Sequence, residues 1–130
     1  MAPYRRPSWF FRHIANPLWT ALGFATTLAV PGRTTGEWRT VAIHVLELDG
    51  ARYLVAPRGD TEWVRNLRAS GTGEIRRRGS REPFHATDVP VEQRPPIIAA
   101  YRERWDREVF VHFKALPDAA DHPVFRIESA

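Results

Sequence analysis

The sequence predicts an α+β fold whose core is a small, closed or half-closed β-barrel. Several β-branched and apolar runs are joined by short turns that contain glycine, which favours strands that pair mostly antiparallel. The helical segments are few and lie outside the strand pattern. Curling such a sheet into a barrel hides most strand edges, so a barrel with peripheral helices is the expected architecture.

Composition narrows both the number of domains and the chemistry. The chain has 130 residues, 43% of them hydrophobic, which predicts a single domain over residues 1–130 with a substantial core. It contains no cysteine, which excludes disulfides, thiolate zinc sites and a cysteine nucleophile. The net charge is +4 and almost every basic residue is arginine, so an anionic partner is expected, whether a coenzyme, a nucleic acid or a membrane surface.

The N-terminal part is predicted to be helical. Residues 1–23 form this segment in our interpretation, and residues 24–130 form the barrel with its peripheral helices. Ser8 is placed to cap a helix over "WFFRHIA", and Asn16-Pro17 restarts a second helix.

An apolar stretch at 17–30 raises the question of a membrane segment. It is shorter than the roughly 20 residues of a membrane-spanning helix, and no small-residue cleavage site follows it. The sequence therefore predicts neither a transmembrane helix nor a signal peptide, and it predicts a cytoplasmic protein. The aromatic and basic residues 4–14 leave a peripheral membrane contact open, as the alternative to a helix packed on the domain.

The first strands are predicted from one strong hairpin signal. Residues 24–30 are expected to be extended, and "RTVAIHVLEL" at 39–48 is β-branched and predicts one long strand. Asp49-Gly50 is a typical two-residue hairpin turn, which joins this strand to "ARYLVAP" at 51–57.

A short helix is expected next. Gly59-Asp60-Thr61 offers an N-cap to "EWVRNLRA", and Gly71 is a plausible C-terminal stop.

The remaining elements are a second hairpin, a helix and a last strand. "TGEIRRRGSREPFHATDV" alternates polar and apolar positions and turns near Arg78-Gly79-Ser80. "VEQRPPIIAAYRERW" predicts a helix that starts or restarts at Pro95-Pro96, because proline is tolerated only in a first turn. "HPVFRIES" reads as a final short strand.

Motifs of hydrolases, P-loop proteins and dinucleotide-binding proteins are absent from the sequence. The histidines are widely scattered, so no metal site is predicted from His13, His44, His85, His112 and His122. Carboxylates and arginines alternate on the predicted C-terminal helix, which indicates a solvated ion-pair face formed by Glu103, Asp106 and Glu108 with Arg102, Arg104 and Arg107.

Basic and hydroxyl residues gather beside glycines in two loops. The first loop holds Arg33, Thr34, Thr35 and Arg39, and the second is the segment 58–61 before the predicted helix. Backbone N–H groups at a helix N-terminus, with arginine nearby, suit a phosphate or a carboxylate. A capped helix with solvated arginines explains the same residues, and the residues alone leave both interpretations open.

The run "RRRG" at 76–79, with Arg65, Arg68 and Arg81, suggests a nucleic-acid-binding module. Residues alternate in direction along a strand, so the three consecutive arginines do not share one face. No set of stacking aromatic residues accompanies them. A solvated hairpin tip is the favoured interpretation, and nucleic acid is the less favoured partner.

Three segments in order resemble the deazaflavin-dependent nitroreductase and quinone reductase family of actinobacteria, whose members bind coenzyme F420. "GRTTGEWRT" is similar to the family's Gly-Arg-basic-Ser/Thr-Gly-x-x-Arg turn, and "YLVAPRGD" to its strand ending in Ser-Lys-Gly-Gly. "EWVRNLRASG" is similar to its Trp-x-x-Asn-Leu-Lys/Arg-Ala helix. The resemblance covers about residues 18–90 and implies a split β-barrel of the FMN-binding-like type.

The resemblance also implies roles for the loop residues. Arg33 and Arg39 would meet the phosphate or tail carboxylates of the coenzyme, and Thr34 or Thr35 would donate a hydrogen bond to them. The other cofactor-binding residues would be Arg58 and Gly59, which border the deazaflavin and its chain, and Trp63 and Asn66, which hold the pocket wall. The chain departs from the family pattern where Thr34 replaces a basic residue and Pro57-Arg58 replaces Ser-Lys.

His44 is the candidate catalytic residue. It follows Arg39 by five residues, and on one continuous strand it would point to the opposite face. It lies near the position at which the family places a substrate-facing aromatic residue, where it would donate a proton to a reduced quinone or nitro product. A structural histidine is the alternative. Tyr101, Trp105 and Phe113 are candidates for an apolar substrate wall.

The resulting functional hypothesis is a deazaflavin-dependent oxidoreductase. It would transfer hydride from reduced coenzyme F420 to a quinone, nitro compound or similar electron-poor, apolar acceptor, with FMN as the less favoured cofactor. The alternative is a non-catalytic split-barrel protein that binds a flavin-like or lipidic ligand, and the third hypothesis is the nucleic-acid-binding module. The sequence leaves open whether the chain is a monomer or a homodimer.

Overall fold

A computed structural model describes residues 26–130 of the chain. The predicted helical segment 1–23, with its helices at Ser8 and Asn16-Pro17, and the membrane contact predicted for residues 4–14 lie outside the described residues.

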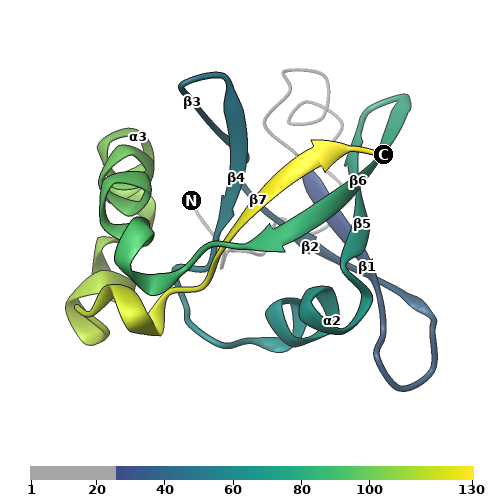
Figure 1. Cartoon of the computed structure of the whole chain (residues 1–130), viewed down its shortest axis with the longest axis horizontal. Coiled ribbons are helices and arrows are strands. Elements are labelled where there is room, and N and C mark those ends of the chain that lie inside the picture. Colours follow the sequence, from purple (N-terminus) through teal and green to yellow (C-terminus); the bar gives the residue numbers. More distant parts are fainter. Residues whose placement is uncertain (1–25) are drawn as a thin grey trace.

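Seven antiparallel strands form one curled sheet, which confirms the predicted half-barrel (Figure 1). Their spatial order is β2-β1-β5-β6-β7-β4-β3. The strands are β1 (Thr27–Pro31), β2 (Trp38–Ala42), β3 (Leu46–Leu48), β4 (Ala51–Val55), β5 (Thr72–Arg77), β6 (Ser80–Asp88) and β7 (Val124–Ser129). The helices are α2 (Glu62–Ser70) and α3 (Arg94–Ala115), with two 3-10 turns, η1 (Val91–Gln93) and η2 (Ala119–Asp121).

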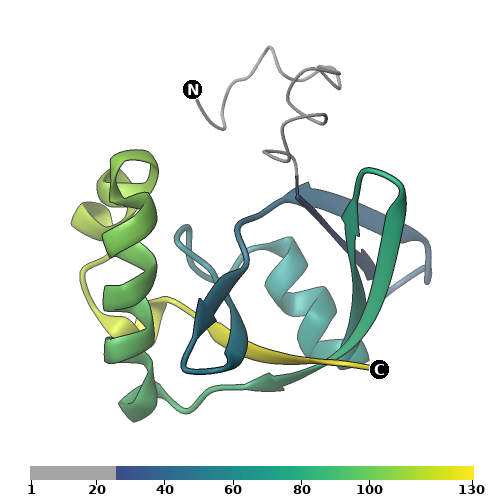
Figure 2. The same ribbon diagram turned by 90° about the horizontal axis from the view of Figure 1, so that it is seen from above.

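The two helices cover different parts of the sheet. Helix α2 packs on β1 and β5, and α3 packs on β3 and β4. Figure 2, seen from above, shows α2 within the outline of the curled sheet, whereas Figure 1 shows it below the strands. Helix α2 therefore closes one end of the half-barrel.

The core has two parts because the two helices bury separate apolar surfaces. Val64 and Leu67 of α2 lie three residues apart, on one face of the helix, and both are fully buried. They join the first cluster, whose larger members are Leu28, Leu54, Ile75, Phe84 and Phe125. The second cluster lies under α3 and includes Leu46, Val55, Ile97, Tyr101, Val109 and Phe113.

Both predicted hairpins and the predicted helix stop are confirmed. Asp49 and Gly50 have φ values of 52° and 80°, as a two-residue turn between β3 and β4 requires. Strands β5 and β6 pair from Arg77 and Ser80 outward. Gly71 has a φ of 72°, and its N–H donates to the Leu67 carbonyl at 2.7 Å, so α2 ends there.

The prediction of one long strand over 39–48 is wrong. The run is interrupted at 43–45, and its two halves pair with different strands: β2 with β1, and β3 with β4. Because β2 and β3 lie at opposite ends of the sheet, one straight strand cannot satisfy both pairings. Ile43 and Val45 pack against the first core cluster, so the β-branched pattern reflects burial rather than an unbroken strand.

The predicted helix over 91–105 begins later and extends further. Residues 91–93 form η1, and α3 starts at Arg94 with proline in its first turn. Helix α3 continues to Ala115, with an interruption at Trp105, where φ is −127° and ψ is 17°. Among the described residues, no helix is both long and apolar enough to span a membrane.

Candidate functional site

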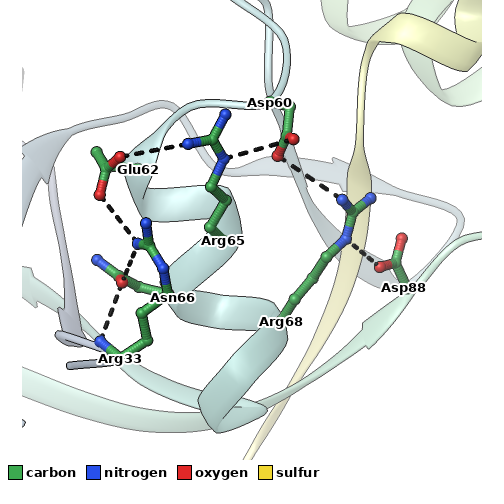
Figure 3. Close-up of polar contacts among 7 residues, drawn as sticks. All are labelled: Arg33, Asp60, Glu62, Arg65, Asn66, Arg68 and Asp88. Atoms are coloured by element: carbon green, nitrogen blue, oxygen red, sulfur yellow. Dashed lines mark hydrogen bonds and ion pairs between the residues drawn. The ribbon is translucent and has the colours of Figure 1, made fainter.

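The two loops singled out in the sequence both adjoin helix α2: the first is bonded to it, and the second leads into it. The backbone N–H of Arg33 and its guanidinium both donate to Oδ1 of Asn66, at 3.1 and 2.8 Å (Figure 3). The same guanidinium donates to Glu62 at 2.9 Å. Asn66 is only 3% exposed, so these bonds attach the β1–β2 loop firmly to the first two turns of α2.

The β1–β2 loop is also closed on itself. The N–H of Gly32 donates to the Glu37 carbonyl at 2.8 Å, and the N–H of Gly36 donates to the Gly32 carbonyl at 2.9 Å. Thr35 Oγ1 accepts a bond from the Glu37 N–H at 3.2 Å, whereas Thr34 is exposed at the loop tip. A Cβ on Gly32 would lie 3.3 Å from Arg39 Nε, so this glycine lets the arginine side chain approach the loop backbone.

The second loop, residues 56–61, leads into the N-terminus of α2. The N–H of Gly59 donates to the Ala56 carbonyl at 3.2 Å, and the N–H of Thr61 donates to the Gly59 carbonyl at 2.9 Å. Gly59 is buried with a φ of 88°, a conformation that side chains rarely adopt. Arg58 is exposed and, within the described residues, neither it nor Arg39 makes an ion pair.

Thr61 occupies the N-cap position of α2, as predicted, but its side chain makes no capping bond. Its hydroxyl is the one buried side-chain polar atom of residues 26–130 that lacks a hydrogen-bond partner. The N–H groups of a helix's first turn also lack partners within the helix. An unpaired hydroxyl and unpaired backbone donors therefore lie together at a helix N-terminus, which are the kinds of donor that an oxyanion requires.

Charged side chains continue from this point along α2. Arg65 contacts Asp60 and Glu62, each at 3.5 Å, and Arg68 contacts Asp60 at 3.8 Å (Figure 3). Arg68 also donates to Asp88 at 2.7 Å. These contacts form one chain of alternating charge across the α2 surface. The pKa of Glu62 lies below its ordinary value, mainly because of the hydrogen bond from Arg33.

A hollow of about 330 Å³ lies at the other end of this charged chain. Its polar lining consists of Arg58, Asp60, Arg68, Arg94 and Asp121. The buried Arg94 donates to the Val89 carbonyl at 2.9 Å and lies 3.6 Å from Asp88, so its position is fixed. The charged chain, the hollow and the neighbouring Arg39 together hold six arginines and four carboxylates, and this excess of positive charge favours an anionic ligand. They are Arg33, Arg39, Arg58, Arg65, Arg68 and Arg94, with Asp60, Glu62, Asp88 and Asp121.

Trp63 and Asn66, the residues expected in a pocket wall, also serve the fold. Trp63 packs against the first core cluster, and its ring lies 5.9 Å from that of Phe125. Asn66 accepts the two bonds from Arg33 described above.

His44 does not lie on a strand with Arg39, so the expected opposite-face geometry is wrong. It occupies the break between β2 and β3, and its Nε2 lies 3.0 Å from Glu108 Oε1 on α3. Its ring stacks on Trp105 at 4.5 Å with an angle of 9° between the planes. Glu108 therefore pairs with His44 rather than with an arginine of its own helix.

The three aromatic residues predicted to form an apolar substrate wall differ in burial. Tyr101 and Phe113 are buried in the second core cluster, and the Tyr101 ring lies 5.0 Å from Trp105. Trp105 is half-buried, between Tyr101 and His44.

Sequence reasoning missed the role of Arg65, Arg68 and Arg94. On sequence alone, Arg65 and Arg68 group with the basic run at 76–79. In the structure, Arg76 of that run pairs with Glu74 at 2.9 Å and lies over the Trp38 ring. The spacing of Glu62 and Arg65 was an available signal, since residues three apart are neighbours on a helix. The contacts with Asp88 join distant segments and leave no local signal.

Comparisons with known proteins show the family and the fold of this chain. The model of the F420H(2)-dependent quinone reductase family matches residues 3–111. No curated protein matches the chain.

Several solved structures share the fold. An F420-H2-dependent reductase (FDR-A) is 21% identical, with a TM-score of 0.62, over 79% of this chain and 92% of that chain. A protein of unknown function from Agrobacterium tumefaciens is 19% identical, with a TM-score of 0.61, over 82% of this chain and 48% of that one. This chain therefore spans about half the length of the Agrobacterium protein. A NimC/NimA family protein from Clostridium acetobutylicum is 14% identical, with a TM-score of 0.54, over 85% of this chain and 75% of that chain.

Proposed function

Because this chain belongs to the F420H(2)-dependent quinone reductase family, we propose that it transfers a hydride from reduced coenzyme F420 to a quinone or a similar electron-poor, apolar acceptor. Its cofactor class and its assignment as an oxidoreductase follow from the family. The acceptor and the residues that act are our proposal. When bound, the coenzyme supplies the hydride, so the protein itself needs to bind, orient and donate a proton.

One observation supports the proposal above all others: two loops distant in sequence converge on the N-terminus of α2. Within residues 26–130, the buried Thr61 hydroxyl lacks a hydrogen-bond partner, and neither Arg39 nor Arg58 makes an ion pair. An anionic coenzyme tail supplies the acceptor that these donors lack. The residues present therefore fit coenzyme F420.

The residues have distinct roles in this proposal. Arg39 and Arg33 bind the phosphate or the tail carboxylates, and Thr34 or Thr35 donates a hydrogen bond to them. Arg58 and Gly59 border the coenzyme at the second loop, where Gly59 packs against the Asp121 carbonyl and Leu116 and the exposed Arg58 is left to meet the ligand. Asn66 holds Arg33 in place.

Two further roles complete the site. Trp63 supports the wall from the core side. His44 donates the proton that the reduced acceptor needs.

The test is a fluorescence titration of the purified protein with coenzyme F420. We expect Arg39→Ala to weaken binding about tenfold or more, since it removes one charge-assisted contact of roughly 1.5–3 kcal/mol. Arg77→Ala is the matched control, because Arg77 is an exposed strand arginine on the distant β5–β6 hairpin. Equal effects of the two substitutions would indicate diffuse charge rather than a defined site.

Oxidation of the reduced coenzyme is then followed with a panel of quinones. Binding without oxidation would favour a non-catalytic binding protein. Absence of binding at micromolar coenzyme would contradict the proposed function.

A further inference from the structure

His44 is held by two contacts that lie in different directions. Its Nε2 bonds to Glu108 Oε1 at 3.0 Å, and its ring lies flat against Trp105 at 4.5 Å. Both partners belong to α3, one at its interruption and one shortly after it. The stacking fixes the plane of the imidazole and the hydrogen bond fixes its rotation within that plane. His44 nevertheless keeps 32% of its side chain exposed, so a ligand has access to it.

Glu108 also determines which ring nitrogen carries a proton. The hydrogen bond from His44 holds the pKa of Glu108 below its ordinary value, so this carboxyl is ionised at neutral pH. An ionised carboxylate only accepts hydrogen bonds, so Nε2 must be the protonated nitrogen. Nδ1 is thereby left for other chemistry: it donates when the ring is doubly protonated and accepts when the ring is neutral.

Among residues 26–130, the other charged groups near the ring do not compete for this bond. The Arg104 guanidinium lies over the Trp105 ring, 4.7 Å from its centroid. Burial raises the pKa of the Tyr101 hydroxyl, so it stays protonated across the physiological range. Glu108 is therefore the carboxylate that orients His44.

We propose that Glu108 is a positioning residue that aligns His44 to deliver a proton from Nδ1 to an oxygen of the acceptor. The inference rests on the proposed function. Reduction of a quinone to a quinol adds one hydride and one proton. The Nδ1–H bond breaks as the new O–H bond forms, and the neutral ring keeps its proton on Nε2 beside Glu108. The ring regains a proton from solvent, and the coenzyme, oxidised by loss of hydride, releases its remaining proton to solvent.

The experiment compares Glu108→Ala with Asp106→Ala. Asp106 is a matched control because it is also half-exposed on α3 and pairs with Arg102 at 2.6 Å. With saturating reduced coenzyme, we expect Glu108→Ala to lower kcat about tenfold or more, with little change in the KM for quinone or in coenzyme affinity. Asp106→Ala should leave all three unchanged. If Glu108→Ala does not fold, Glu108→Gln removes the charge at nearly constant size.

A second readout needs no coenzyme. Nitrogen NMR of the His44 ring at alkaline pH should show the Nε2-protonated tautomer in the wild type and in Asp106→Ala, but a mixture of tautomers in Glu108→Ala. The carboxyl of Glu108 should titrate below its ordinary range in the wild type and return to that range in His44→Ala.

The outcomes distinguish failure of the positioning role of Glu108 from failure of the proposed oxidoreductase function. A wild-type protein that oxidises the coenzyme, together with a Glu108→Ala variant as active as Asp106→Ala, overturns the positioning role alone. An unchanged tautomer in Glu108→Ala overturns it as well. A wild-type protein that does not oxidise the coenzyme overturns the proposed function and the proton donor with it.

Discussion

Asn66→Ala tests whether the anchor of the β1–β2 loop matters for both stability and binding. The substitution removes the acceptor of two bonds from Arg33, one from the backbone N–H at 3.1 Å and one from the guanidinium at 2.8 Å. Asn66 itself is 3% exposed, so water does not easily replace its oxygen. A neutral bond contributes roughly 0.5–1.5 kcal/mol and a charge-assisted one roughly 1.5–3 kcal/mol.

The free energy of unfolding is expected to fall by about 2 kcal/mol, toward the lower end of the sum of the two bond contributions. Arg33 keeps its second partner, Glu62, and its guanidinium lies at the surface, where solvent reaches it. With a urea m-value of roughly 2 kcal/mol per molar, the unfolding midpoint should fall by about 1 M. Coenzyme affinity should fall about tenfold or more, because the β1–β2 loop, which presents Arg33 and leads into Arg39 on β2, loses its attachment to α2.

The measurements are urea unfolding followed by tryptophan fluorescence and the coenzyme titration. Asn66→Asp is the control, since it keeps an acceptor oxygen of the same shape in the same place and should stay close to the wild type in stability. If Asn66→Ala unfolds within about 0.5 kcal/mol of the wild type and binds the coenzyme equally well, the loop does not depend on this anchor.

Two further predictions concern the barrel. The bidentate bond from Arg52, at 2.9 and 2.6 Å, is the main reason why the pKa of Glu82 falls from 4.5 to about 2. Because the folded pKa is depressed, this stabilisation is complete above about pH 4.5 and is lost as the pH falls toward 2. Acid titrations of unfolding free energy should therefore show a smaller slope in Glu82→Gln. Gly73→Ala should lower stability by roughly 1–3 kcal/mol in thermal unfolding, because its Cβ would lie 2.8 Å from the Phe84 ring and 2.9 Å from the Ala29 carbonyl oxygen.

The parts of the fold that the sequence predicts well are those with local causes. Asp49-Gly50 adopts the positive φ values that its two-residue turn requires, and Gly71 ends α2 as a left-handed cap. In both cases, the signal and the structure lie within a few residues of each other.

Errors arise where the cause is distant. The break at 43–45 follows from the pairing of β2 and β3 with different strands, and no residue within the break is a turn former. The environment of His44 is likewise determined by Trp105 and Glu108, about sixty residues further on. Periodicity identifies such residues as partly buried, but it does not identify their neighbours.

The contacts around Thr34 indicate how the site accommodates the loss of a basic residue at this position. Thr34 replaces a basic residue in a loop that is still closed by its own backbone bonds and still attached to α2 through Arg33. Arg65 supplies a positive charge on α2 that lies outside the family's motif, since Arg68 already occupies the motif's own basic position. The ion pairs of Arg65 with Asp60 and Glu62 are exposed, so an anionic ligand can compete for this arginine at little cost. Coenzyme binding is therefore expected to survive the loss of the basic residue at Thr34.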